Sequence, residues 1–118
     1  MKYMLMICRD EQVWDRLGAT ERQRIYQETV ELSEELTARG QYLGGFPLHP
    51  SAAATSVRMR DGKRLVTDGP FAETREQLGG YMLVDVGDLD EAIAIAARIP
   101  LARTSTVEIR PVREGPPR

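Results

Sequence analysis

The sequence is short of the residues from which metal centres, disulfides and covalent catalytic sites are usually built. Its 118 residues include one cysteine, one histidine and one tryptophan. A lone cysteine excludes an internal disulfide, and one cysteine with one histidine cannot supply the ligands of a common zinc site. Glycine-rich phosphate-binding loops and the serine nucleophile elbow are also missing. We therefore expect neither a metal nor a cofactor.

The sequence also lacks a strong charge imbalance and a long hydrophobic run. Its net charge of −2 gives no reason to expect a nucleic-acid partner. The apolar segment 3–8 is too short for a membrane span or a signal-peptide core, so we expect no membrane association and a cytoplasmic location. Length and composition predict one globular domain over residues 1–113, followed by a disordered tail at 114–118.

Hydrophobic periodicity predicts an α+β fold. Strands are expected at residues 2–8, 41–46, 79–86 and 106–112. Helices are expected at residues 20–39 and from residue 89 to Pro100, which ends the second helix. Irregular segments are expected at 10–19 and 72–78, the latter with one helical turn at Thr74. Asp61-Gly62 is a favoured hairpin turn, which predicts a β-hairpin over residues 54–68. This order indicates a ferredoxin-like antiparallel sheet with two helices on one face and an added hairpin.

The first predicted strand has apolar side chains on both of its faces. Odd and even positions of residues 3–8 are all apolar, whereas a strand half exposed to water alternates apolar and polar residues. Helices would cover only one face of the sheet, and the other is too apolar to leave in water. We therefore expect a homodimer in which two sheets stack, each burying about 800 Å².

The hairpin register gives a direction for one carboxylate. A two-residue turn at 61–62 pairs Thr55 with Asp68 and Val57 with Val66. Asp68 then shares a face with Val57, Met59 and Val66, so we expect it to point inward.

The candidate catalytic residues are His49 and Asp68. A carboxylate that orients an imidazole leaves the other ring nitrogen free to transfer a proton. The alternative gives them separate roles, with His49 as an exposed loop residue between prolines and Asp68 as a cap for the amides of its own turn. Nineteen positions and a hairpin separate them, and that spacing does not decide between the two.

Other prominent side chains also have two interpretations each. Trp14 is expected to close one end of the core, the alternative being the wall of a binding site. Phe71 is expected to anchor its turn in the core, the alternative being a ligand pocket. The basic residues of the hairpin are expected to form a solvated edge rather than a nucleic-acid site; they are Arg58, Arg60, Lys63 and Arg64.

One long motif connects the chain to a known family. Residues 66–81 read VTDGPFAETREQLGGY and residues 88–92 read DLDEA; with MKYML at the start and VEIRPV at 107–112, they resemble the DGPF subgroup of YCII-related proteins. The resemblance covers nearly the whole chain. It implies a ferredoxin-like, dimeric α/β-barrel fold and a His-Asp pair in a cleft. Asp68 matches the aspartate of the motif, whereas Cys8-Arg9-Asp10 departs from the small or aromatic residues expected after the first strand.

The resemblance implies a homodimer with a small-molecule cleft beside the DGPF turn. Its expected ligand-pocket residues are Gly69, Pro70, Phe71 and Glu73, and its chemistry would be cofactor-free acid/base catalysis by His49 and Asp68. The alternative is a non-catalytic binding or regulatory module, since some proteins of this type are associated with extracytoplasmic-function sigma factors. Whether the chain is an enzyme stays open at this point.

Overall fold

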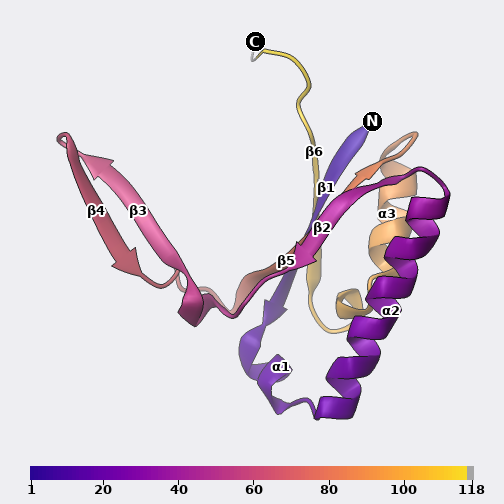
Figure 1. Cartoon of the computed structure of the whole chain (residues 1–118), viewed down its shortest axis with the longest axis horizontal. Coiled ribbons are helices and arrows are strands. Elements are labelled where there is room, and N and C mark those ends of the chain that lie inside the picture. Colours follow the sequence, from indigo (N-terminus) through magenta and orange to yellow (C-terminus); the bar gives the residue numbers. More distant parts are fainter. Residues whose placement is uncertain (117–118) are drawn as a thin grey trace.

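A four-stranded antiparallel sheet forms the centre of the protein (Figure 1). The computed structural model describes residues 1–116. The strands are β1 (Lys2–Asp10), β2 (Tyr42–Pro47), β5 (Glu76–Asp85) and β6 (Thr106–Pro111). They lie in the order β2-β5-β1-β6, and each neighbouring pair is antiparallel. This arrangement confirms the predicted α+β, ferredoxin-like class.

Two helices pack on one side of the sheet, α2 (Ala19–Ala38) and α3 (Leu89–Arg98) (Figure 1). The predicted start of α3 is confirmed, because the Asp88 carboxylate accepts a hydrogen bond from the Glu91 amide at 2.9 Å. Beyond the end of α2, Gly40 has a φ of +72°, which a residue with a side chain rarely adopts. Local capping chemistry therefore sets where both helices stop or start.

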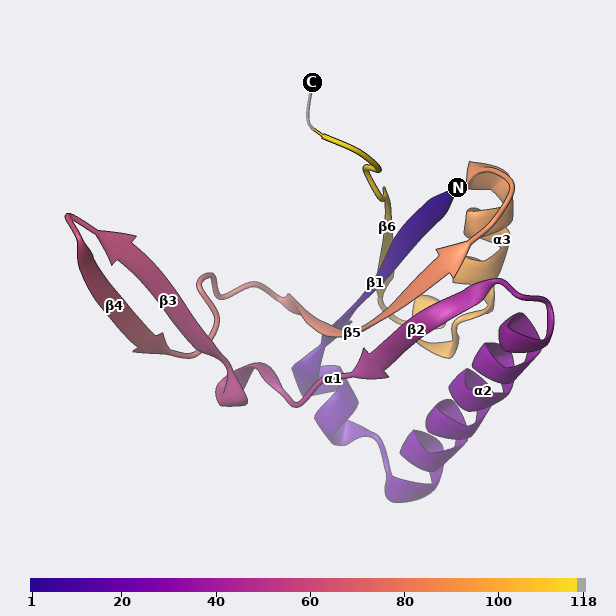
Figure 2. The same ribbon diagram turned by 45° about the horizontal axis from the view of Figure 1, so that its top comes forward.

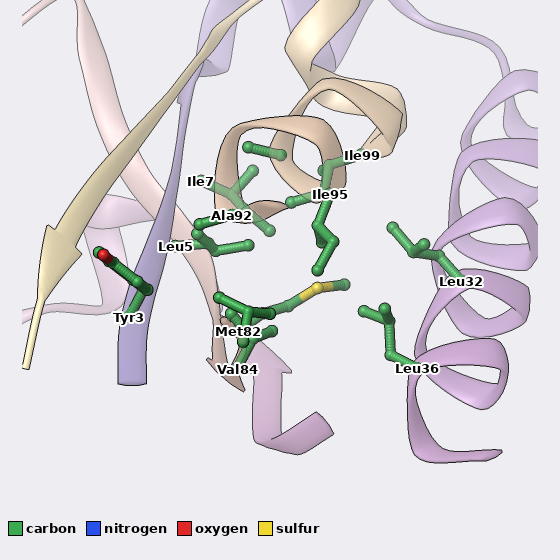
Figure 3. Close-up of a cluster of buried hydrophobic side chains, with 12 residues drawn as sticks. Tyr3, Leu5, Ile7, Leu32, Leu36, Met82, Val84, Ala92, Ile95 and Ile99 are labelled. Carbon is green, nitrogen blue, oxygen red and sulfur yellow. The ribbon is translucent and has the colours of Figure 1, made fainter. Parts of the chain in front are cut away.

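The core lies between these helices and the inner face of the sheet (Figure 3). Alternate residues of β1 point inward, and Leu5 is fully buried there in one cluster with Val84 of β5 and Leu36 of α2. Full burial of one such aliphatic side chain is worth about 1.5–3 kcal/mol. The period-2 pattern of β1 thus places half of its apolar residues in a core that the chain completes by itself.

The other face of the sheet is apolar and has no helix over it in the described part of the chain (Figure 2). Met4 and Met6 of β1 lie opposite Leu83 and Tyr81 of β5, and all four are only half-buried. We call this surface the open sheet face. Its composition matches the expectation of a strand that is apolar on both sides.

The β3–β4 hairpin projects away from the rest of the molecule (Figure 2). It consists of β3 (Thr55–Arg60) and β4 (Lys63–Asp68), which form a separate two-stranded sheet. Asp61 and Gly62 both have positive φ, 51° and 74°, as a type I′ turn requires, and the predicted register is confirmed.

The inward direction expected for Asp68 is wrong for the single chain, because Asp68 is exposed with the whole of β4. Register decides which residues share a face, but a face becomes an inner face only where something packs against it.

Two other segments differ from expectation. The predicted loop at 10–19 contains a short helix, α1 (Glu11–Arg16), because the Asp10 carboxylate accepts hydrogen bonds from the Gln12 and Val13 amides and caps it. No helical turn forms at Thr74, and β5 begins at Glu76, earlier than expected.

The chain also contains two short 3-10 helices, η1 (Ser51–Ala53), which follows a proline, and η2 (Pro100–Arg103), which begins with one. Of the predicted tail at 114–118, residues 117–118 lie outside the described residues.

Candidate functional site

The DGPF motif forms one wall of an open cleft at the junction between the hairpin and the sheet. This DGPF cleft has a volume of about 700 Å³, and α1 and η1 form its other walls. Its charged lining residues are Asp10, Glu11, Arg16, Glu73 and Arg75. Such a lining suits a polar ligand rather than an apolar one.

Hydrogen bonds to two carboxylates at the start of α1 join the walls of the cleft. The Glu11 carboxylate accepts a hydrogen bond from the Ser51 amide at 2.7 Å and another from the Ser51 hydroxyl. The bond from that hydroxyl is the main reason that the pKa of Glu11 lies below its ordinary value. On the other side, the Asp10 carboxylate accepts a hydrogen bond from Arg75 Nε at 3.2 Å, which lowers the pKa of Asp10. Residues 40 or more positions apart are thereby tied to one short helix.

The DGPF turn is held by its backbone. Gly69 has a φ of +92°, and its amide donates a hydrogen bond to the Ala54 carbonyl at 2.7 Å. The Ser56 hydroxyl donates to the Gly69 carbonyl, also at 2.7 Å. A glycine at this position is explained by the positive φ, which is strained for residues that carry a Cβ.

The candidate catalytic residues do not meet within the chain. His49 is exposed in the loop after β2, Asp68 is exposed at the end of β4, and neither lines the DGPF cleft. Among residues 1–116, no hydrogen bond or ion pair joins them. The alternative role of Asp68 is not seen either, because its carboxylate accepts no hydrogen bond from its own turn in this part of the chain. Whether they act as a pair in an assembly stays a prediction.

The expected ligand-pocket residues separate into two groups. Gly69, Pro70 and Glu73 line the DGPF cleft. Phe71 does not; its side chain is 83% exposed and borders a shallow hollow on the hairpin with Arg58 and Leu65. The expectation that Phe71 anchors the turn in the core is therefore wrong for the single chain, because the turn continues the projecting hairpin and no core lies within its reach.

A second, more apolar hollow lies on the helix side of the sheet. This Arg9 cavity has a volume of about 330 Å³ and lies between α2 and strands β1, β2 and β5, with α1 at one end. Ile25, Tyr26 and Val30 of α2 form its apolar wall. Trp14 also lines it, so the tryptophan that was expected to close the core is instead the wall of a cavity.

Arg9 is the buried charge of this cavity. Its side chain continues the inward face of β1 and is only 8% exposed, and its guanidinium lies over the Trp14 ring, 4.6 Å from the ring centre. The Nε atom is buried and has no hydrogen-bond partner. Burial lowers the pKa of Arg9, although an arginine stays protonated in proteins. Gly79 makes this position available, because a Cβ on residue 79 would lie 2.9 Å from Arg9 Nε.

No candidate metal centre is present among residues 1–116, since no three histidine, cysteine or carboxylate side chains gather there. Within the same residues, no helix has both the length and the apolar character needed to cross a membrane.

Sequence reasoning missed Arg9. The strand was predicted to end at Cys8, which left Arg9 in a loop, whereas β1 continues to Asp10. Residues 3, 5, 7 and 9 are buried in turn, so a longer period-2 reading would have placed an arginine on the core face. The signal that could have revealed Arg9 is a charged residue at a position where the alternation of the strand places side chains in the core.

Comparisons with known proteins agree with the family resemblance in the sequence. The sequence model of the YCII-related domain family matches residues 1–115. The chain is also 34% identical over 114 residues to an uncharacterized protein of Rhizobium meliloti (strain 1021), which covers 95% of this chain and 92% of the relative.

Proposed function

Because the chain belongs to the YCII-related domain family, we propose that it is a DGPF-type member that works as a homodimer and binds a small polar molecule in the DGPF cleft. The observation that carries this proposal is the cleft itself, since Gly69, Pro70 and Glu73 all line it. Of the charged side chains around it, Asp10, Glu11 and Arg75 already form hydrogen bonds, which lowers the entropy lost when a ligand binds.

The homodimer is supported by two uncovered apolar surfaces. One is the open sheet face, with Met4, Met6 and Tyr81 near its centre. The other is the hairpin face that carries Val57 and Val66, whose side chains are 59% and 56% exposed. A second copy of the chain that stacks its sheet on the first would remove the open sheet face from water.

Light scattering tests the homodimer directly. We expect the mass of two chains at micromolar concentration, and we expect Met6→Glu to shift the mass toward one chain because it places a charge in the centre of the interface. Gln23→Glu on the exposed surface of α2 is the matched control, because it adds the same charge away from the open sheet face, and it should leave the mass unchanged. A wild-type mass of one chain would contradict the homodimer.

Binding in the cleft can be mapped by nuclear magnetic resonance. We expect members of a defined mixture of small polar metabolites to shift the amide signals of Gly69, Glu73 and Arg75. Ser51→Ala removes a donor to Glu11 and should weaken these shifts, whereas Ser33→Ala on α2 should not. Shifts that are confined to other parts of the chain, or no shifts, would contradict binding in the cleft.

Acid/base chemistry is the catalytic form of this proposal. His49 would carry the proton and Asp68 would orient its imidazole, with the dimer bringing both side chains to the cleft. The second candidate is a non-catalytic binding or regulatory module, including one linked to extracytoplasmic-function sigma factors. The separation of exposed His49 and Asp68 in the single chain favours this second candidate.

The only histidine provides the test between these two candidates. If Asp68 contacts His49, Asp68→Asn will move the nuclear magnetic resonance signals of the His49 ring protons, and Asp61→Asn at the hairpin tip will not. Unchanged ring signals in the Asp68→Asn dimer would rule out the pair and leave the binding or regulatory module.

A further inference from the structure

The Arg9 cavity is a second hollow that the proposed function does not use. It shares no lining residue with the DGPF cleft. The two hollows lie on different sides of α1, with Trp14 lining the cavity and Gln12 and Val13 lining the cleft. The chemistry of the cavity must therefore be explained separately.

The charged side chains that line the cavity are all basic. Arg9 and Arg22 both line it, and none of its lining residues is acidic. Burial lowers the pKa of Arg9, and Glu11 and Asp15 oppose this shift from outside the lining without forming an ion pair with it. Arg22 donates hydrogen bonds to the backbone carbonyls of Trp14 and Asp15, at 3.3 and 2.9 Å. Arg9 has no such partner for its buried Nε and forms no ion pair within residues 1–116. A buried cation without a hydrogen-bonded counter-charge is unfavourable. The buried Nε lies beside Gly79, so an anionic group in the cavity would pair with the terminal guanidinium nitrogens, which form no hydrogen bond within residues 1–116.

The remaining lining selects the kind of anion. The hydroxyl groups of Thr29 and Ser33 already donate to backbone carbonyls of α2, at 2.7 Å each, so they add little polarity to the wall. Apart from glycine backbone and tyrosine hydroxyl groups, the other lining surfaces are aliphatic or aromatic. With about 330 Å³, the cavity is at the lower end of the range for small-molecule sites, about 300–1,000 Å³. A fully hydrated inorganic anion fits such a lining poorly, whereas a small organic acid offers both a charge and an apolar body.

We propose that the Arg9 cavity binds a small organic carboxylate whose charged group pairs with Arg9 and whose apolar body packs against α2 and Trp14. A planar guanidinium suits a carboxylate because two parallel N–H donors can meet its two oxygens. Stacking on Trp14 holds the guanidinium in place before the ligand enters, which reduces the entropy lost on binding. This site goes beyond the proposed DGPF cleft and does not depend on it.

The only tryptophan of the chain gives the site its own optical signal. Because Trp14 lines the cavity and no other tryptophan contributes, its fluorescence reports on this cavity. The helix α1, which carries Trp14, also borders the DGPF cleft, so variants at Arg9 and Gly79 assign the signal to the cavity. The probes are phenylacetate, 3-phenylpropionate and hexanoate, each compared with its neutral amide. We expect a saturable fluorescence change with at least one acid at or below about 1 mM, and binding at least about tenfold weaker for the matching amide.

Three variants locate the anion. Arg9→Gln should weaken binding of the acid by about tenfold or more and leave binding of the amide unchanged. Gly79→Ala keeps the arginine but puts a Cβ 2.9 Å from its Nε, so it should weaken acid binding even if Arg9→Gln folds poorly. Arg24→Gln, an exposed residue of α2 that pairs with Glu21 and does not line the cavity, is the control and should bind like the wild type.

Several results would overturn the proposal. Equal affinity of acid and amide would show an apolar cavity without anion recognition. Unchanged acid binding in folded Arg9→Gln would place the anion elsewhere. The absence of a saturable change with all three acids in the wild type would remove the site, and then Arg9 would serve only to stack on Trp14. These results are independent of signal shifts at Gly69 and Glu73, which test the DGPF cleft.

Discussion

The body of the domain and the hairpin differ in what covers their apolar side chains. In the body, Leu36 of α2 and Val84 of β5 are fully buried by other parts of the same chain. In the hairpin, Met59 and Val66 share a face and are 67% and 56% exposed. Both regions have well-formed strands and good turns. Regular backbone pairing thus occurs in both, while burial occurs in only one.

This difference indicates separate origins of stability. The body is stabilised by burial between helices and sheet, which the chain supplies alone. A two-stranded hairpin without a packed face is marginally stable in water. We therefore expect the hairpin to be stable only when another surface covers it. In our proposal, that surface comes from the second copy of the chain.

The largest expected difference comes from one substitution made in both regions. Leu36→Ala should lower the free energy of unfolding by about 2–5 kcal/mol, because it leaves a cavity at a fully buried position. Leu65→Ala in β4 should change it by no more than about 0.5 kcal/mol, because Leu65 is 45% exposed and lies on the hairpin face opposite Val66. Urea denaturation followed by circular dichroism measures both. Equal losses would show that the hairpin is packed as tightly as the body.

A smaller difference is expected from two glycines with nearly the same strain. Gly40 and Gly62 have φ of +72° and +74°, and a Cβ on either would meet no atom within 4 Å. Alanine at each position should therefore cost about 1–2 kcal/mol locally, from backbone strain alone. Gly40→Ala should lower the global stability, whereas Gly62→Ala should only speed amide hydrogen exchange in the hairpin. Global destabilisation by Gly62→Ala would show that hairpin and body unfold together.

The smallest expected effect concerns the ion pair between Asp10 and Arg75. The hydrogen bond from Arg75 lowers the pKa of Asp10 in the folded state. Such a group adds stability above its unfolded pKa, about 3.9, and this contribution disappears as the pH falls through the lower folded value. Asp10→Asn should therefore destabilise the protein near neutral pH and have less effect in strong acid. Unfolding curves from strong acid to neutral pH measure this effect, with Asp61→Asn at the hairpin tip as the control. A difference in unfolding free energy between wild type and Asp10→Asn that stays constant with pH would contradict the linkage.

Much of the fold could be predicted because its signals are local. The Asp88 cap and the turn at Asp61-Gly62 both depend on residues within three or four positions, and both are confirmed. The segment 10–19 was predicted as a loop, whereas six of its residues form α1. A helix this short shows no clear hydrophobic periodicity, and its sequence signal is one local cap, Asp10.

The sites were less predictable because they join distant segments. The DGPF cleft needs Glu11 to reach Ser51 and Asp10 to reach Arg75, over separations of 40 and 65 positions. Gly69, Pro70 and Glu73 of the motif line the cleft, but nothing in the motif indicated that Phe71 would face away. Arg9 was missed because the role of one buried charged residue in a strand can be recognised only when the cavity around it is known.

The strands, the two longer helices, the hairpin register and the family follow from periodicity, caps, turn residues or a long motif, although β1 and β5 are longer than expected. Which faces are covered depends on tertiary packing. It buried Arg9 beside Trp14 without an ionic partner, and it left Asp68 in solvent on a projecting hairpin. The physical reason is that register and capping act over a few residues, whereas burial depends on what the rest of the chain brings against a surface.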